Sequence, residues 1–192
     1  MAKFEIADKI TGINEGGYAN NPADRGGETY AGIARNFWSN WSGWKYIDRY
    51  KADYQKAKLA GTTKLSVAGW VNASAKVPTE PVRGLVVKFY KDEFWDANKL
   101  DQISDQQVAN SVYDFGVNSG KGRAVQFLEQ MFGVKKDGIM DPVVIKHVNS
   151  SDPKKVLTEY NAKRKEAYVS WAIGNQKQFL NSWLSRLKPY QG

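Results

Sequence analysis

The sequence contains no cysteine and only one histidine, His147, among its 192 residues. Without cysteine the chain has no disulfide, no thiolate metal site and no cysteine nucleophile. A single histidine excludes a multi-histidine metal site and argues against a Ser-His-Asp triad, so we expect neither a metal nor a cofactor. No apolar run exceeds three residues, so we expect no membrane-spanning segment. Any catalysis must therefore use carboxylates, hydroxyls, amides or aromatic rings.

The charge is unbalanced toward the positive side. Lysine and arginine number 28 against 20 acidic residues, which gives a net charge of +8. Nucleic acid, anionic lipid and bacterial cell wall are all anionic partners that suit such a chain. The sequence has no helix-turn-helix pattern, so we do not expect it to bind nucleic acid. The first residues carry Glu5 where a signal peptide needs an apolar core, so we expect synthesis in the cytoplasm without a signal peptide. We also expect a monomer.

Start signals for helices are frequent, and they predict a mainly α fold. Asp141-Pro142 and Asp152-Pro153 each place an N-cap aspartate before a first-turn proline. Ser104 and Gln107 have the spacing of a capping box. Pro81 opens a further helix with apolar residues on one face. By contrast, the aromatic stretch 37–70 has no clean period and predicts irregular structure with one helix at 47–59.

The most irregular composition follows the first predicted helix. Ile6, Ile10 and Ile13 form an amphipathic stripe that leads to Glu15, and two glycines then stop the helix. Residues 20–27 are almost wholly turn-forming, and residues 28–33 are compatible with an extended segment.

Two acidic residues flank this glycine-rich segment. Glu15 stands where a helix ends against a loop, a position in which partial burial raises a carboxyl pKa and favours a general acid. Asp24 lies nine residues further on, and a folded loop would bring the two carboxyls to face each other. Paired carboxyls are the machinery of glycoside hydrolysis. Spacing alone favours the other interpretation, in which Glu15 is a solvated helix end and Asp24 supports a turn.

The run from Glu15 to Ile33, which begins Glu-Gly-Gly-Tyr, resembles the signature of glycoside hydrolase family 108, the N-acetylmuramidases of phages and prophages. Further similarities to this family follow in order along the chain, at residues 94–96, 113–120, 134–139 and 183–186. The resemblance implies a lysozyme-like, mainly α fold with a short irregular or β loop region after the first helix. It also implies a catalytic region at 1–97 and a peptidoglycan-binding helical region at 98–192, packed together as one unit.

The resemblance further implies which residues act. Glu15 corresponds to the family's catalytic glutamate. The spacing of Glu15, Asp24 and Thr29 is also similar to that in phage lysozymes, where the aspartate and the threonine position the attacking water. Thr29 stands one residue closer to the aspartate than in those enzymes, so Glu28 or Tyr30 are alternatives for its place.

Residues of the same segments are candidates for holding the sugar. Tyr18, Asn20 and Tyr30 are expected to shape the cleft. Asp114 and Asn118 are four residues apart, so a single helix would place both on one face, and the family places this segment near the cleft. The alternative for the second pair is a helix-end cap.

Together with the resemblance, these observations predict an endolysin-like N-acetylmuramidase that hydrolyses bacterial peptidoglycan with Glu15 as the general acid. We expect no stable insertion into a membrane. We also expect the protein to reach the cell wall after release from the cytoplasm. Two alternatives remain. A lytic transglycosylase also uses one glutamate but forms an anhydro product. A non-catalytic basic protein would bind wall polymer and would be indifferent to Glu15→Gln.

Overall fold

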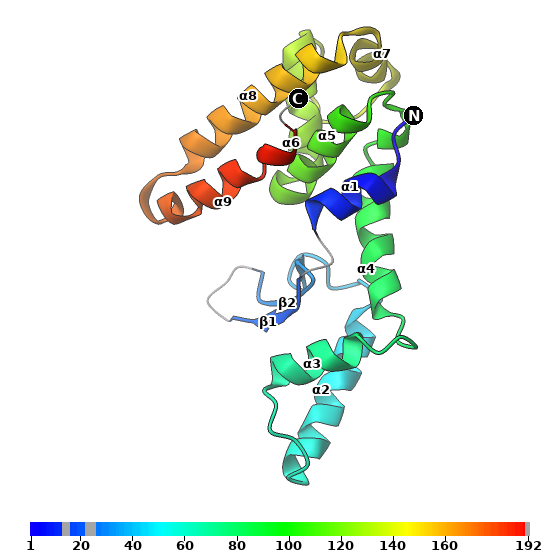
Figure 1. The fold of residues 1–192 in the computed structure, drawn as a ribbon, viewed down its shortest axis with the longest axis vertical. Coiled ribbons are helices and arrows are strands. Elements are labelled where there is room, and N and C mark those ends of the chain that lie inside the picture. Colours follow the sequence, from blue (N-terminus) through cyan, green and yellow to red (C-terminus); the bar gives the residue numbers. More distant parts are fainter. Residues whose placement is uncertain (13–15, 22–25, 191–192) are drawn as a thin grey trace. The chain divides into compact units, whose positions relative to one another are not determined.

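The computed structural model describes residues 1–12, 16–21 and 26–190 (Figure 1). It confirms the predicted mainly α fold with a small β region after the first helix. The chain divides into two compact units. The terminal unit consists of Met1–Thr11 and Tyr90–Gly192, and the inserted unit consists of Gly12–Phe89. The predicted functional division between 1–97 and 98–192 stays a prediction.

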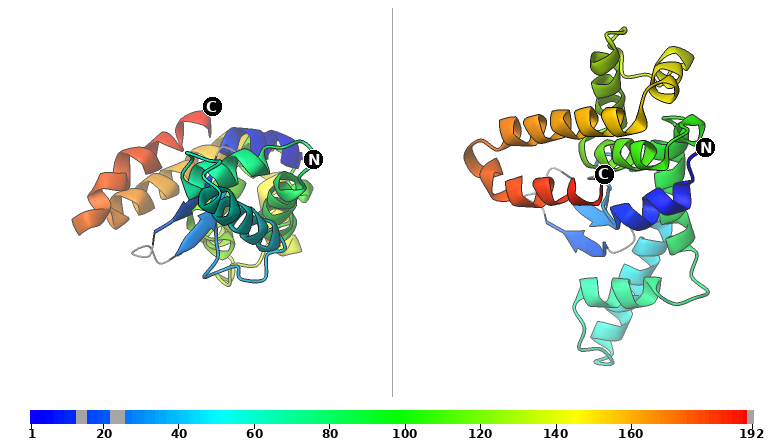
Figure 2. Two further views of the ribbon diagram at one scale, coloured as in Figure 1. Left: turned by 90° about the horizontal axis from the view of Figure 1, so that it is seen from below. Right: turned by 45° about the horizontal axis from the view of Figure 1, so that its top comes forward.

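The inserted unit combines a small sheet with helices. Its strands and helices are β1 (Tyr18–Asn20), β2 (Glu28–Tyr30), β3 (Ile33–Ala34), α2 (Trp44–Leu59), α3 (Val67–Ala75) and α4 (Val82–Tyr90), of which α4 ends one residue into the terminal unit. Helices α2 and α3 pack against each other (Figures 1 and 2). The stretch 37–70 is more regular than predicted, because α2 begins three residues earlier than expected and α3 was missed.

The sheet is antiparallel with the strand order β1-β2-β3. Tyr18 pairs with Tyr30, which in turn pairs with Ile33 across a two-residue turn. The turn residues Ala31 and Gly32 have φ angles of 48° and 78°. Such left-handed angles match the right-handed twist of a tight hairpin. The segment predicted to be extended at 28–33 is therefore two strands and a turn.

Aromatic residues form much of the core of the inserted unit. Trp44 is buried in the first turn of α2, and its ring centroid lies 5.2 Å from that of Trp41. Trp38 packs edge-on against Phe89, with the ring centroids 4.8 Å apart. These tryptophans thus contact other aromatic rings, which stabilises a core through both buried area and favourable ring geometry.

The terminal unit is helical. It contains α1 (Phe4–Thr11), α5 (Gln106–Ser119), α6 (Lys121–Phe132), α7 (Pro142–Ser150), α8 (Pro153–Trp171), α9 (Leu180–Ser185), a π-helical turn at Lys91–Asp96 and 3₁₀ turns at Leu100–Gln102, Gly174–Phe179 and Lys188–Tyr190. Helices α8 and α9 lie side by side (Figure 2). None of the helices in the described part of the chain is long and apolar enough to cross a membrane.

The predicted apolar stripe of the first helix is wrong. Ile6 is 43% exposed, whereas Phe4, Ala7 and Asp8 are buried. The ring of Phe4 packs edge-on against Tyr113, and the Tyr113 hydroxyl donates to Asp8. An aromatic anchor and a polar contact therefore select a face of α1 that the isoleucine spacing does not indicate. Ile13, the last member of the stripe, lies outside the described residues.

Local start signals fared better, with one exception. The Asp141 and Asp152 carboxylates cap α7 and α8, where they accept hydrogen bonds from the backbone N–H groups of Val144 and Lys154. The predicted capping box at Ser104 is wrong by one residue, because the Asp105 carboxylate is the cap of α5. A carboxylate two residues before a free N–H satisfies the helix end as well as a hydroxyl does.

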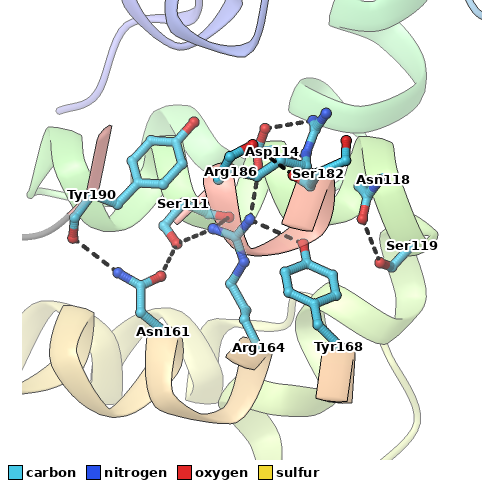
Figure 3. Close-up of polar contacts among 11 residues, drawn as sticks. Ser111, Asp114, Asn118, Ser119, Asn161, Arg164, Tyr168, Ser182, Arg186 and Tyr190 are labelled. Atoms are coloured by element: carbon cyan, nitrogen blue, oxygen red, sulfur yellow. Dashed lines mark hydrogen bonds and ion pairs between the residues drawn. The ribbon is translucent and has the colours of Figure 1, made fainter. Parts of the chain in front are cut away.

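Helix α5 carries a buried ion-pair cluster (Figure 3). The Asp114 carboxylate lies between Arg164 of α8 and Arg186, and Arg186 Nη2 is 2.6 Å from Asp114 Oδ1. Arg164 is fully buried and also donates to Ser111 Oγ at 2.8 Å. Tyr168 contributes its hydroxyl to the same guanidinium. A charge buried this deeply is tolerated only when partners surround it.

Replacing Asp114 by alanine would leave the Arg164 guanidinium buried without its counter-charge. We expect the free energy of unfolding to fall by about 3–5 kcal/mol, measured by urea titration at neutral pH. The control is Asp53→Ala, which removes an exposed partner of Lys56 and should cost at most about 1 kcal/mol. Equal losses for the two variants would contradict a structural role for the cluster.

Candidate functional site

A cleft of about 1140 Å³ lies within the inserted unit. Its lining comes from the two residues before β1, the end of β2 with the β2–β3 turn, the end of α3, the α3–α4 junction and α4. The lining residues are Gly16, Gly17, Tyr30, Ala31, Asn72, Ala75, Lys76, Val77, Pro78, Glu80, Arg83, Gly84, Val86 and Val87. Apolar walls with a few convergent polar groups are typical of ligand sites.

Two glycines allow one edge of this cleft to form. A Cβ atom at Gly16 would stand 3.0 Å from the Cα of Ala31, and one at Gly17 would stand 2.8 Å from the side-chain nitrogen of Asn72. The Gly17 carbonyl accepts a hydrogen bond from Ala31 N at 3.1 Å, and Tyr18 N donates to Asn72 Oδ1 at 2.8 Å. The backbone that follows Glu15 in sequence is thereby fixed against the β2–β3 turn and α3.

The predicted catalytic carboxyls themselves are not described. Glu15 and Asp24 both lie outside the described residues, so their predicted roles stay predictions. Gly16, which directly follows Glu15 in the chain, lines the cleft. Thr29, the third predicted catalytic residue, is half-buried in β2, where it pairs with Ala19 and Ala34.

The predicted sugar-binding residues of the β region lie together on the sheet. Tyr18 and Tyr30 face each other across β1 and β2, and Asn20 pairs with Glu28 at the far end of the same strands. Because side chains alternate along a strand, these four share one face and Thr29 points to the other. Tyr30 lines the cleft, and burial raises the pKa of its hydroxyl. Tyr18 is buried and Asn20 is exposed.

A charged network covers the same face of the sheet. The Glu28 carboxylate accepts hydrogen bonds from the Tyr18 hydroxyl at 2.8 Å and from Lys51 Nζ and Arg35 Nη1 at 2.6 Å each. Arg35 also forms a bidentate ion pair with Asp48. These contacts join β1, β2 and α2. They give a structural role to Glu28, which was one of the alternatives to Thr29.

The network shifts the pKa values of its members. Burial would raise the pKa of Glu28, but the donors Lys51, Arg35 and Tyr18 together outweigh burial and hold this pKa below its usual value. Burial and the adjacent Glu28 carboxylate raise the pKa of Tyr18 to about 12. Glu28 is therefore ionised and Tyr18 is neutral throughout the physiological pH range.

The second predicted pair, Asp114 and Asn118, belongs to the terminal unit and does not line the cleft. Both carboxylate oxygens of Asp114 contact arginine side chains, as described above. Asn118 is exposed near the end of α5 and accepts a hydrogen bond from Ser119 Oγ (Figure 3). Gly120 is both the C-cap of α5 and the N-cap of α6. The alternative prediction, that Asn118 caps the helix end, is therefore wrong.

Sequence reasoning missed several polar residues of the cleft: Asn72, Lys76, Glu80 and Arg83. Asn72 has no recognisable motif, because its role depends on a contact 54 residues away along the chain. Lys76 and Glu80 lie in the α3–α4 junction at 76–81, and Arg83 lies in the first turn of α4; only the predicted helix start at Pro81 marked this segment as ordered. Among the described residues, no group of three or more His, Asp or Glu side chains is arranged to hold a metal ion.

Comparisons with known proteins point to one family. A family model described as Glycosyl hydrolase 108 matches residues 9–120, more than half of the chain. The solved structure of Brucella abortus SagA is 23% identical, with a TM-score of 0.64, and the match covers 98% of this chain and 91% of that one. At this identity the similarity concerns the fold, which agrees with the expected lysozyme-like, mainly α architecture. No curated protein sequence gives a match.

The glycine contact predicts that a single methyl group has opposite effects at two places in the cleft. Gly16→Ala must displace the Ala31 backbone, so we expect a loss of about 1–3 kcal/mol in the free energy of unfolding. Gly84→Ala is the matched control, because its added Cβ meets nothing within 4 Å on helix α4. That change should stabilise the protein by up to about 1 kcal/mol. Wild-type stability of Gly16→Ala would contradict the close contact.

The lowered pKa of Glu28 predicts a pH dependence of stability. Because the folded-state pKa lies below the unfolded value of about 4.5, ionised Glu28 stabilises the fold above that pH, and this contribution is lost as the pH falls through the folded pKa. Glu28→Gln should therefore destabilise the protein by about 1–2 kcal/mol at pH 7, and by progressively less below about pH 4.5. The control Glu166→Gln changes an exposed residue on α8 and should show no such trend. A pH-independent loss for Glu28→Gln would refute the assignment.

Proposed function

The chain belongs to glycosyl hydrolase family 108, and on that premise we propose that it is an N-acetylmuramidase that hydrolyses the β-1,4 bond between N-acetylmuramic acid and N-acetylglucosamine in bacterial peptidoglycan. One observation supports this proposal above the others. The cleft in the inserted unit is lined by Gly16 and Gly17, the two residues that directly follow the candidate acid Glu15. The lysozyme-like fold is consistent with the same chemistry.

The proposed mechanism begins with Glu15. In its protonated form this residue donates its proton to the glycosidic oxygen as the bond to C1 of N-acetylmuramic acid breaks. The departing sugar thereby leaves as a neutral alcohol. Asp24 stabilises the positive charge that develops on the ring, and with Thr29 it orients the water that adds to C1. The proton that this water loses passes to one of the two carboxylates. The separation of the two carboxyls decides between inversion and retention of configuration at C1.

The surroundings of the cleft suit an extended glycan. Tyr30 presents an aromatic ring supported by Trp41, with near-parallel planes at 15° and ring centroids 6.3 Å apart. Asn72 contributes a side-chain amide, a group that can hydrogen-bond hydroxyls or N-acetyl groups. We propose that these residues shape the sugar sites together with Tyr18 and Asn20. The substrate lies in the cell wall, so action there follows release from the cytoplasm.

Glu15→Gln removes the transferable proton and keeps the size of the side chain. We expect the rate of peptidoglycan solubilisation, followed by turbidity, to fall about a hundredfold or more, with an unchanged unfolding midpoint. Glu5→Gln, an exposed change on α1, is the matched control and should retain full activity.

Mass spectrometry of the released muropeptides checks the reaction type. Reducing N-acetylmuramic acid ends are expected. Anhydro-muramic ends would instead identify a lytic transglycosylase, and a fully active Glu15→Gln protein would refute the role of Glu15.

A further inference from the structure

The cleft of the inserted unit carries two exposed cations. Lys76 directly follows α3, and Arg83 lies in the first turn of α4 (Figure 1). Within the described part of the chain, neither side chain forms an ion pair with a carboxylate. Two positive charges therefore line the same cleft, and neither is paired with a carboxylate of residues 1–12, 16–21 or 26–190.

Four other cations of the inserted unit, Arg35, Arg49, Lys51 and Lys56, form ion pairs with carboxylates, whereas Lys45, Lys58 and Lys64 form none with the described residues. Arg35 and Lys51 share Glu28 and Asp48, as described above. Arg49 forms an ion pair with Glu80. Lys76 and Arg83 are the cations without a carboxylate partner among the described residues that line the cleft.

Glu80 is the acidic member of the described cleft lining, and it is already occupied. Its carboxylate accepts a hydrogen bond from the Tyr50 hydroxyl at 2.6 Å and contacts the Arg49 guanidinium. These donors lower the pKa of Glu80, the hydrogen bond from Tyr50 being the largest cause. Glu80 is thus an anion whose partners are Arg49 and Tyr50. Because it does not pair with Lys76 or Arg83, it does not compete with a ligand for them.

We propose that Lys76 and Arg83 bind carboxylate groups attached to the muramic acid units of the substrate. These are the carboxylates of the peptide that extends from the lactyl group or, on units that carry no peptide, the free lactyl carboxylate itself. This inference rests on the proposed function. The glycan backbone itself carries no charge, so these substituents are its anionic groups. An arginine can hold a carboxylate by two parallel hydrogen bonds, and a lysine adds a flexible point charge.

The neighbouring surface fits such a substituent. Val77 and Pro78 lie between the two cations in sequence, and Val86 and Val87 follow on α4. A peptide of small apolar residues with free carboxylates would contact this surface with its methyl groups and reach the cations with its charges. The site would then favour wall glycan over an uncharged polymer of the same linkage.

The test measures binding by co-sedimentation, in a Glu15→Gln background so that the polymer is not consumed. The test variant combines Lys76→Gln with Arg83→Gln. The matched control combines Lys56→Gln with Lys64→Gln, which removes the same two charges from the same unit outside the cleft lining. Three polymers are compared: peptidoglycan freed of teichoic acid, the same material stripped of peptides by an amidase, and chitin, which has no carboxylate.

We expect the test variant to bind peptidoglycan roughly three- to tenfold more weakly than its parent, with the control unchanged. The difference should shrink at high salt, because the contacts are exposed ion pairs. A loss confined to peptide-bearing material assigns the peptide carboxylates, and a loss that persists on stripped material assigns the lactyl carboxylate. Equal binding by parent and test variant, an equal loss in the control, or an equal loss on chitin would overturn the inference.

The two proposals fail separately. Binding is measured in the absence of catalysis, so the effect of Lys76 and Arg83 on binding can be tested independently of the reaction type. Protein with the native Glu15 that shows this binding but releases no fragments from peptidoglycan would overturn the hydrolase and support the carboxylate site. Cleavage that proceeds while binding is insensitive to Lys76 and Arg83 would do the reverse.

Discussion

The close contact of Gly16 and Gly17 with Ala31 and Asn72 is the constraint on which the candidate site depends. It brings the start of β1, the β2–β3 turn and α3 within hydrogen-bonding distance of one another. A Cβ atom at Gly16 would press on the Ala31 backbone, and one at Gly17 would press on the Asn72 side chain. These four residues are among those that line the cleft, so this contact helps to shape it. The candidate acid Glu15 directly precedes this fixed segment in the sequence.

The two units manage charge in different ways. In the terminal unit, Arg164 is buried with Asp114 and ring faces around it, so its charge is satisfied inside the core. In the inserted unit, Glu28 and Arg35 belong to a half-buried network that joins the sheet to α2. Both clusters join segments distant in sequence, and their geometry depends on several donors at once. Removing one partner therefore costs more than an isolated surface pair would suggest.

Features that depend on residues close together in the sequence were predicted correctly, whereas features that depend on distant contacts were not. The caps at Asp141 and Asp152 were predictable because the carboxylate and its N–H partner lie within three residues. The face of α1 was not, since it is chosen by the packing of Phe4 on a helix about a hundred residues away. In the site, the glycine pair and Tyr30 were recognisable from the motif. Asn72 and the cleft cations were not, because only the folded chain brings them to the same surface.

The net charge of +8 is therefore less informative than the pairing of individual charges. A cation that neutralises a neighbouring carboxylate is largely unavailable to a ligand, because releasing it would leave the carboxylate desolvated and unpaired. A cation exposed in a cleft is solvated by water, costs the fold little, and stays free to exchange water for a ligand. Composition cannot separate these two populations, whereas contacts can. For a hydrolase of a polymer whose backbone is neutral, the second population is where discrimination between substrates would originate.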